Sequence, residues 1–252
     1  MSKLMKLFLF LAAAAVSLTI AACSGTDRTN IDTDDPDKAF AIAMKSYEEK
    51  DYLQAIDDFS FIKVKFSGTN ISDKSQYYLG MSYLKREEFI LAAYEFEYLL
   101  KNYGTSSFAV DGRFQLAMCY FGLSPDYSLD QTYTYQAINE LKNFLELYPT
   151  DKNAPVAEAK IKELRSKLAY KDLKAAQLYY KMDDYKASIV YFEHVVSEYF
   201  DTEYADDALY GKINSLITRK KYDDAKKEIE RFESRFPNSD LLQKVLRMKK
   251  SI

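Results

Sequence analysis

The stretch GMSYLKREEFILAAYEFEYL, residues 80–99, decides the fold of this chain. Gly80 and Tyr83 lie in a first helical segment, Ala92 and Phe96 lie in a second, and a charged run separates the two. Small residues allow two helices to cross closely, and large aromatic side chains fill the space beside the crossing. The stretch therefore predicts a tightly packed pair of helices.

The pattern of this pair recurs five times along the chain. Its small positions are Ala55, Ala92, Ala137, Ser188 and Ala225, and a large apolar residue follows four positions later, at Phe59, Phe96, Leu141, Phe192 and Ile229. The spacings of 37, 45, 51 and 37 residues indicate a repeat array, and the residues at these offsets resemble the tetratricopeptide (TPR) pattern. We expect an all-α fold, a superhelical array of five TPR-like helix pairs. Such arrays present long surfaces to partners and rarely do chemistry.

The two longer spacings predict departures from a regular array. The third repeat holds about eight extra residues between its helices, around Ser124 to Ser128. Between the third and fourth repeats, Pro155 begins a helical stretch that continues without a breaker to about Met182. We expect this long helix to join the two halves of the array.

The N-terminal residues 1–22 read as a signal peptide. Lys3 and Lys6 precede an apolar stretch from Leu7 to Ile20, which is too short to span a bilayer as a helix. The residues that follow it, Ala21-Ala22-Cys23, complete a resemblance to a bacterial lipobox. That resemblance implies cleavage before Cys23 and lipidation of Cys23; the alternative is an ordinary cleaved signal that happens to precede a cysteine. Ser24 stands where many inner-membrane lipoproteins carry Asp, which favours the outer membrane.

The remaining chain divides by composition. Residues 23–37 are polar and acidic and predict a lipidated, flexible tether. We expect repeats 1–3 in residues 38–150, the bridging helix with repeats 4 and 5 in residues 151–240, and a C-terminal tail in residues 241–252. The formal net charge is −3, and about −5 without Lys3 and Lys6, which argues against nucleic acid as the main partner.

No pattern in the sequence predicts catalysis, a metal site or a cofactor. The pairs Asp57-Asp58, Asp183-Asp184 and Asp223-Asp224 are interpreted as helix caps or solvated surface rather than as metal ligands or acid–base pairs. His194 is the only histidine, and Cys119 stands in an apolar setting that favours a buried structural thiol. We therefore predict a protein that is not an enzyme.

A second register runs along the first helix of each of the first three repeats. It places aromatic, Met and large apolar residues at i, i+4 and i+7. The nine groove residues defined in this way are Phe40, Met44, Tyr47, Tyr77, Met81, Leu84, Phe114, Met118 and Phe121. They predict an apolar groove that adapts to varied ligands, with an ordinary core stripe as the alternative. In the fourth and fifth repeats the Met position becomes Gln177 and Asn214, so the groove is expected to turn polar there.

A lipobox, a short tether, five TPR-like repeats and an insertion in the third repeat together resemble the BamD family. This family comprises lipoproteins of the outer-membrane β-barrel assembly machinery. The most specific segment is Asp130-Gln131-Thr132, which leads into a helix that ends in Tyr148-Pro149. Ser67 and Gly104 depart from the family pattern, which has Pro at the ends of the first two repeats.

The resemblance implies a non-enzymatic scaffold anchored by lipid on the periplasmic face of the outer membrane. It implies that the C-terminal repeats dock the POTRA modules of BamA, that other lipoproteins of the machinery bind, and that the N-terminal groove meets unfolded outer-membrane proteins. A general TPR adaptor of cell-envelope complexes is the alternative. A glycan-binding lipoprotein is less favoured, because the chain has no Trp for stacking on sugars.

Overall fold

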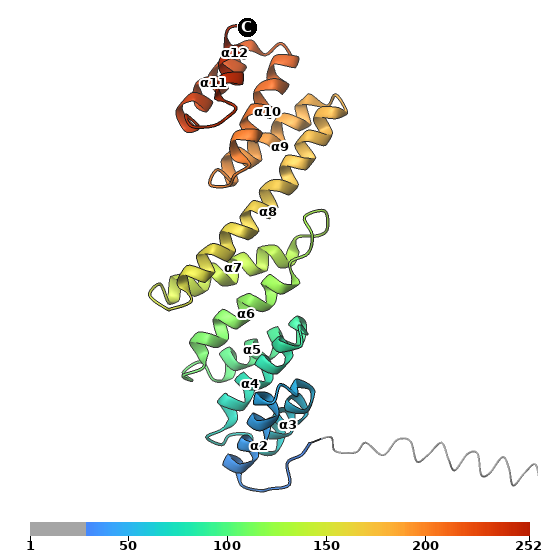
Figure 1. Ribbon diagram of the computed structural model, residues 1–252, viewed down its shortest axis with the longest axis vertical. Coiled ribbons are helices and arrows are strands. Elements are labelled where there is room, and N and C mark those ends of the chain that lie inside the picture. The colour runs from blue at the N-terminus through green and yellow to red at the C-terminus, as the bar shows by residue number, and fades with distance from the viewer. Residues whose placement is uncertain (1–28) are drawn as a thin grey trace, which may run out of the picture. The chain divides into compact units, whose positions relative to one another are not determined.

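The computed structural model describes residues 29–252, which fold into helices without a strand (Figure 1). The helices are α2 (Pro36–Glu48), α3 (Tyr52–Lys65), α4 (Ser72–Lys85), α5 (Phe89–Asn102), α6 (Ala109–Leu123), α7 (Thr132–Leu147), α8 (Ala154–Lys181), α9 (Tyr185–Glu198), α10 (Ala205–Thr218), α11 (Tyr222–Arg235) and α12 (Leu242–Lys249). The all-α array of TPR-like helix pairs is thereby confirmed.

The chain divides into two compact units, and the boundary differs from the one expected at residue 150. Unit 1 is described over residues 29–86, and unit 2 is Glu87–Ile252, so the division falls inside the second repeat. The reason lies in α8, whose residues Ala157, Leu164 and Ala176 belong to one continuous core that also takes in α6, α7 and α9 to α12. Residue 150 therefore lies inside a continuous packing unit.

Unit 1 contains helices α2, α3 and α4, each packed on the next. Its core is built on small residues at the helix crossings, with Ala39, Ala43 and Ala55 fully buried. Phe59 is also fully buried and fills the space that these alanines leave. Asp35 caps α2 by accepting hydrogen bonds from the backbone N–H groups of the first turn, and a Pro stands at the helix start.

The second half of the expected tether is not a free tether. Residues 29–35 form a strap along unit 1, in which Ile31 is buried in the core. Lys65 holds the strap from α3, because its Nζ donates to the carbonyl oxygen of Thr33 at 3.1 Å and pairs with Asp34 at 2.7 Å. Residues 23–28 of the expected tether, with Cys23, and the expected signal peptide lie outside the described residues.

Unit 2 is organised around α8, a helix of 28 residues and therefore about 42 Å long. Its first half contacts α7 and its second half contacts α9 and α10 (Figure 1). Asn153 and Met182 flank it, so the predicted bridging helix is confirmed nearly to the residue. Buried leucines on one face of α8, among them Leu164 and Leu173, join the third repeat to the fourth.

The C-terminal residues form a helix where a tail was expected. In α12 the side chain of Val245 is fully buried, and the helix packs against α11. Lys249 pairs with Glu233 of α11 at 3.1 Å. The array therefore ends in a capping helix, which covers apolar surface that the last repeat would otherwise expose.

Four turns between paired helices share one backbone conformation. Lys50, Glu87, Asp183 and Lys220 adopt φ angles of 64°, 60°, 60° and 58°. These φ angles lie in the left-handed region, which Gly adopts at the end of a helix with the least steric strain. In the described chain the third repeat lacks such a residue between its helices, because the insertion takes the place of the tight turn.

Candidate functional site

The groove residues of unit 1 are mostly half-buried. Phe40, Met44, Tyr47, Met81 and Leu84 each keep part of their side chain accessible, whereas Tyr77 is 9% exposed and belongs to the core. Phe40, Met44 and Tyr47 lie on α2 and pack against the core of unit 1 with one side. An apolar side chain in this position stabilises the core and also presents surface to a ligand.

An aromatic cluster lies behind these residues. The ring of Tyr78 lies 6.0 Å from that of Phe40, 5.2 Å from that of Tyr47 and 5.9 Å from that of Phe59, measured between centroids. Burial, with the neighbouring Tyr52 and Tyr78, raises the pKa of Tyr47 to about 12, so its hydroxyl stays protonated. Lys74 places its Nζ 4.3 Å from the centroid of Phe40. The cluster holds the α2 side of the expected groove in a fixed arrangement.

The three groove residues of unit 2 lie on α6. Phe114 is 7% exposed and packs on Phe144, so it acts as core, whereas Met118 and Phe121 are half-buried. Lys160 of α8 stands 4.0 Å from the centroid of the Phe121 ring. Of the nine groove residues, Tyr77 and Phe114 are thus ordinary core residues, and the other seven keep accessible surface.

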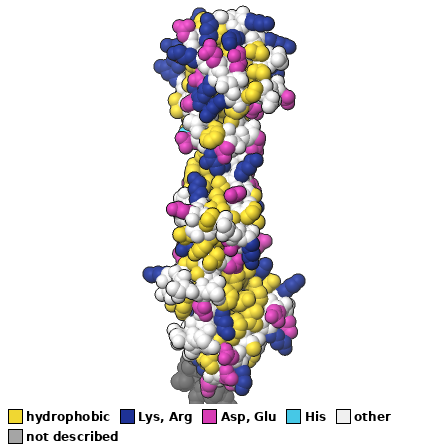
Figure 2. All heavy atoms as spheres, turned by 90° about the vertical axis from the view of Figure 1, so that its left-hand side faces the viewer, with side chains coloured by type: hydrophobic (Ala, Val, Ile, Leu, Met, Phe, Trp, Pro, Cys, Tyr) yellow, Lys and Arg dark blue, Asp and Glu magenta, His cyan; other side chains and the backbone are white. Residues whose placement is uncertain are grey.

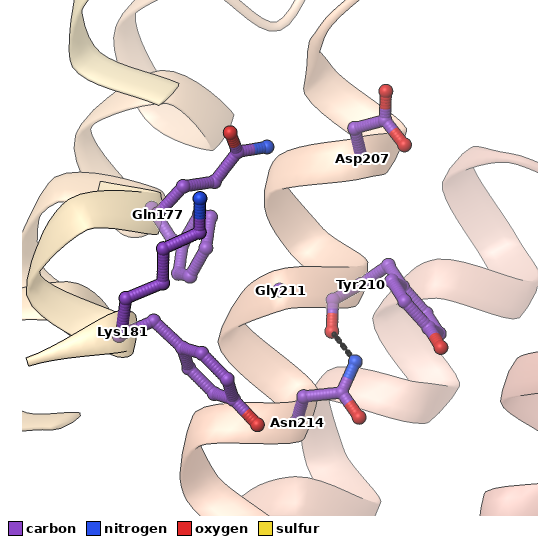
Figure 3. Close-up of a pocket in the computed structure, with 8 residues that line it drawn as sticks. Gln177, Lys181, Asp207, Tyr210, Gly211 and Asn214 are labelled. Atoms are coloured by element: carbon purple, nitrogen blue, oxygen red, sulfur yellow. Dashed lines mark hydrogen bonds between the residues drawn. The ribbon is translucent and has the colours of Figure 1, made fainter. Parts of the chain in front are cut away.

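The same register lines a pocket in the rear repeats, between α8 and α10 (Figure 3). The pocket encloses about 480 Å³, and its wall includes Gln177 and Asn214, the two positions where the sequence predicts a polar groove. Tyr180 and Tyr210 stand at the outer positions of the register, and the buried ring of Phe192 lies beneath. Sequence reasoning found Gln177 and Asn214 but missed Lys181, Asp207 and Gly211, which also line the pocket.

Gly211 sets how closely α9 and α10 approach at this pocket. A Cβ at Gly211 would lie 2.3 Å from Cζ of Phe192, so any other residue would force the helices apart or displace the ring. In Figure 3 the side chain of Gln177 points from α8 toward α10, the side chain of Lys181 extends beside it, and Gly211 lies on α10 between Asp207 and Asn214. The pocket is therefore open above the glycine and apolar at its base.

The insertion of the third repeat is held in place by buried polar contacts. Gln131 is 4% exposed, and its Nε2 donates to the carbonyl oxygens of Asp126 at 2.8 Å and Leu129 at 3.0 Å. Thr134 donates to Oε1 of Gln131 at 2.7 Å. Asp130 accepts from the N–H of Thr132 at 2.9 Å and so supports the start of α7. The Asp-Gln-Thr run that the sequence singled out closes the insertion loop.

Two lysines of the long helix α8 donate hydrogen bonds to the same loop. Lys167 donates from Nζ to Oγ of Ser124 at 2.8 Å and to the carbonyl oxygens of Ser124 and Pro125. Burial lowers the pKa of Lys167, and the nearby Glu163 and Asp126 offset part of that effect. Lys171 adds a bond to the carbonyl oxygen of Leu129 at 3.0 Å. Insertion and bridging helix thus form one fixed surface.

Several other titratable residues that the sequence singled out lie at the start of a helix or contact a neighbouring side chain. Asp184 caps α9, as expected, and Asp223 and Asp224 stand in the first turn of α11. His194 shares a 2.8 Å contact with Asp172. Among the described residues no three His, Cys, Asp or Glu side chains form a group that could hold a metal ion.

Two expectations about single residues had different outcomes. The buried structural thiol is confirmed, because Cys119 is fully buried and unpaired and burial raises its pKa to about 12. The interpretation of Asp58 as a cap or a solvated residue was wrong. Its side chain is completely buried within α3 and accepts four hydrogen bonds.

The surface mixes apolar and charged side chains. Figure 2 shows hydrophobic side chains exposed between lysines, arginines and carboxylates over much of one face. Exposed large apolar residues include Val64, Ile90, Tyr94 and Val190. Across the part of the chain that the structure describes, no helix combines the length and apolarity needed to cross a membrane.

Comparison with known proteins places this arrangement in a family. Residues 32–217, from the strap to α10, match the family model YfiO, described as outer membrane lipoprotein. The chain belongs to this family. The resemblance to the BamD family drawn from the sequence is thereby confirmed.

Two relatives of this chain are both named outer membrane protein assembly factor BamD. The protein of Caulobacter vibrioides is 22% identical over 211 residues, which cover 82% of this chain and 69% of that one. The protein of Rickettsia prowazekii is 22% identical over 192 residues, which cover 76% of each.

Two solved structures of TPR proteins align with this chain at low similarity. A thermophilic TPR protein of Thermus thermophilus aligns with a TM-score of 0.37 and 13% identity, covering 86% of this chain and all of that one. A TPR repeats protein of Bacteroides fragilis aligns with a TM-score of 0.45 and 16% identity, covering 87% and 99%.

Proposed function

We propose that this protein is a non-enzymatic scaffold lipoprotein of the outer-membrane β-barrel assembly machinery. The observation that carries the proposal is the match of residues 32–217 to the family, together with two relatives named as BamD assembly factors. In this role the C-terminal repeats dock the POTRA modules of BamA, and further lipoproteins of the machinery join the same assembly. The helices act by holding partners in place, as repeat arrays do.

The proposal includes a lipid anchor at Cys23 on the periplasmic face of the outer membrane. The strap supports this part, because Thr29 is already hydrogen-bonded to unit 1. Thr29 follows Cys23 by six positions, a reach of at most about 22 Å. A lipid on Cys23 would therefore keep unit 1 close to the membrane surface.

Unfolded outer-membrane proteins are the proposed ligands of the groove residues. Met44, Met81 and Met118 are half-buried, and a flexible thioether can repack around different apolar side chains. Phe40, Tyr47 and Phe121 add aromatic surface of the kind that strand-forming segments can contact. Contacts of this kind, partly exposed and apolar, suit weak and reversible binding.

Crosslinking in intact membranes, followed by identification of the captured proteins, tests the assembly role. A photo-crosslinker at Lys226, which is exposed on α11, is expected to capture BamA. Recovery of cell-envelope proteins without BamA under gentle detergent would instead support a general TPR adaptor.

A matched pair of positions tests the groove separately. A photo-crosslinker at Met44 is expected to capture newly exported outer-membrane proteins. The same group at Val64 is the control, because Val64 is 81% exposed in the same unit and lies outside the groove residues. Equal capture at both positions would remove the groove from the proposal while leaving the assembly role intact.

A further inference from the structure

Another pocket of unit 2 lies outside the surfaces that the proposed function uses. It is formed by α5, α6 and α7, which pack one on the next (Figure 1), and its volume is about 320 Å³. None of the nine groove residues lines it, and no residue of the last two repeats does so. Its lining combines three tyrosines with aliphatic side chains, one carboxylate and one carboxamide. This combination differs from both the groove and the rear pocket.

Two of the three tyrosines form one aromatic wall of the pocket. The ring centroids of Tyr120 and Tyr133 lie 6.3 Å apart with an interplanar angle of 21°, which is an offset-stacked arrangement. Tyr94 of α5 contributes a third ring, and Ile90 and Leu123 add aliphatic surface. The face of an aromatic ring carries partial negative charge and attracts a cation that approaches within about 6 Å of the centroid. The rings therefore favour a cation over an anion.

The carboxylate in the lining has the same preference. Glu97 accepts a hydrogen bond from the hydroxyl of Tyr120 at 2.6 Å, and in the described part of the chain its carboxylate forms no ion pair. No described Lys or Arg lines the pocket, so this negative charge is not compensated there. Burial, the bond to Glu97 and the charges of Glu97 and Glu140 raise the pKa of Tyr120, so its neutral hydroxyl remains the donor.

The pocket suits a cation whose charge is surrounded by methyl groups. A primary ammonium group is strongly hydrated and has three N–H donors to satisfy, whereas the lining offers few acceptors besides Glu97, Gln136 and the tyrosine hydroxyls. A quaternary ammonium group has no N–H donor. Its methyl groups gain contact with the rings and with Ile90 and Leu123, and its charge is attracted by both the rings and the carboxylate.

We propose that this pocket binds a quaternary ammonium group, with its methyl groups against Tyr120 and Tyr133 and its charge near Glu97. The same chemistry occurs in free solutes such as choline and in the headgroup of phosphatidylcholine. The inference goes beyond the proposed function and does not rest on it, because the lining belongs to neither the groove residues nor the C-terminal repeats.

The test is ligand-observed nuclear magnetic resonance with the purified full chain. Saturation transfer to the methyl protons is followed in titrations of choline and of its neutral isostere, in which carbon replaces the nitrogen. We expect choline to bind saturably with a Kd on the order of 1 mM, and the isostere to bind at least about fivefold more weakly. Ethanolamine, which carries a primary ammonium group on the same hydroxyethyl chain, is expected to compete with choline only weakly.

Variants of the chain identify the contacts. Glu97→Gln keeps an acceptor for Tyr120 but removes the charge, so it is expected to raise the Kd of choline by about fivefold and to leave that of the isostere unchanged. Tyr133→Leu is expected to weaken choline binding, and Tyr133→Phe, which keeps the ring, is expected to preserve it. The matched controls are Glu146→Gln on α7 and Tyr222→Leu on α11, two exposed residues that do not line this pocket. Thermal unfolding checks that each variant is folded.

Vesicles of phosphatidylcholine separate the two sources of the ligand. Binding to vesicles that falls in Glu97→Gln would assign the pocket to the lipid headgroup. Equal vesicle binding by the parent protein and Glu97→Gln, together with choline binding that differs between them, would assign it to free solutes.

Four outcomes would overturn the proposal. They are the absence of saturable choline binding, equal affinity for choline and its neutral isostere, unchanged discrimination in folded Glu97→Gln, and loss of choline binding in folded Tyr133→Phe. The capture of BamA in membranes tests the proposed function separately, and none of these results would affect it.

Discussion

The carboxylate of Asp58, completely buried in α3, accepts a hydrogen bond from the backbone N–H of Asn30 at 2.9 Å. The same side chain accepts from Oγ1 of Thr29 at 2.8 Å and from Oγ of Ser46 in α2 at 3.0 Å. One buried group thus joins the N-terminal strap to two helices. Because a buried carboxylate is costly unless its acceptors are satisfied, the strap and Asp58 stabilise each other.

Asp58→Ala is expected to release the strap. The donors of Thr29, Asn30 and Ser46 lose their common acceptor, and we expect unit 1 to lose about 2–4 kcal/mol of stability. Hydrogen exchange at the amide of Ile31 should rise together with a fall in the thermal midpoint. Asp57→Ala is the control, because the half-buried Asp57 makes no hydrogen bond to the strap and lies on another face of the same helix. Equal effects of the two substitutions would show that Asp58 is not the attachment point.

The strap shows where sequence reasoning reached its limit. Residues 24–37 hold one apolar side chain, Ile31, so composition alone indicates a segment that cannot fold by itself. Residues 29–35 of this segment nevertheless pack on unit 1, because α2 and α3 provide a core for Ile31 and an acceptor for its neighbours. The available signal was the position of Asp58 between Ala55 and Ile62, on the apolar face of α3, where a carboxylate requires donors from elsewhere.

Lys220→Gly is expected to stabilise the protein. Lys220 has a φ of 58°, and a side chain in this left-handed region destabilises the folded state by about 1–2 kcal/mol. Gly removes this strain, but its greater conformational freedom in the unfolded chain offsets part of the gain. We expect a net gain of about 0.5–1 kcal/mol in denaturant unfolding, and the same sign for Lys50→Gly. Lys226→Gly, in the middle of α11, is the control and should lose about 1 kcal/mol. A loss in both turn variants would contradict the assignment of strain to these turns.

Lys212→Met is expected to destabilise unit 2 in a pH-dependent manner. Lys212 is 9% exposed and donates to Glu193 and Glu228, each at 2.6 Å, and Arg231 contacts the same carboxylates. Burial raises the pKa of Glu193, but the bonds and charges of Lys212 and Arg231 outweigh it, so the net pKa is lowered. A lowered pKa stabilises the folded state above the unfolded value of about 4.3 and loses that effect as the pH falls through the folded value.

The difference between the parent protein and Lys212→Met should therefore be about 2 kcal/mol near pH 7 and should shrink below about pH 4. Urea unfolding at several pH values measures it. Lys226→Met, which removes an exposed charge from the neighbouring helix, should change stability by less than about 0.5 kcal/mol at every pH. A Lys212→Met effect independent of pH would mean that packing of the lysine stem, rather than its charge, stabilises the network.

The repeat architecture was predictable because it depends on local spacing, whereas the pocket between α8 and α10 was not. The spacing of Ala55, Ala92 and their equivalents along the sequence is enough to predict the helix pairs. The register of the groove residues likewise predicts the polar positions Gln177 and Asn214. Lys181, Asp207 and Gly211 lie outside that register, and their meeting depends on how closely α9 and α10 approach. That approach is decided by the contact of Phe192 with a glycine 19 positions away, which periodicity does not reveal.

Lys167→Met is expected to loosen the insertion of the third repeat without unfolding α8. The ammonium group bonds three oxygens of Ser124 and Pro125, while the methylene stem lies on α8, which the Met side chain can replace. Protease cleavage within residues 124–130 should accelerate, and stability should fall by about 1–2 kcal/mol. Lys171→Met loses the single bond to Leu129 and should show a smaller change in both measurements. Faster cleavage in Lys171→Met than in Lys167→Met would mean that the loop is held mainly at Leu129. The buried bonds of Gln131 should keep α7 itself protected in both variants, because they do not involve α8.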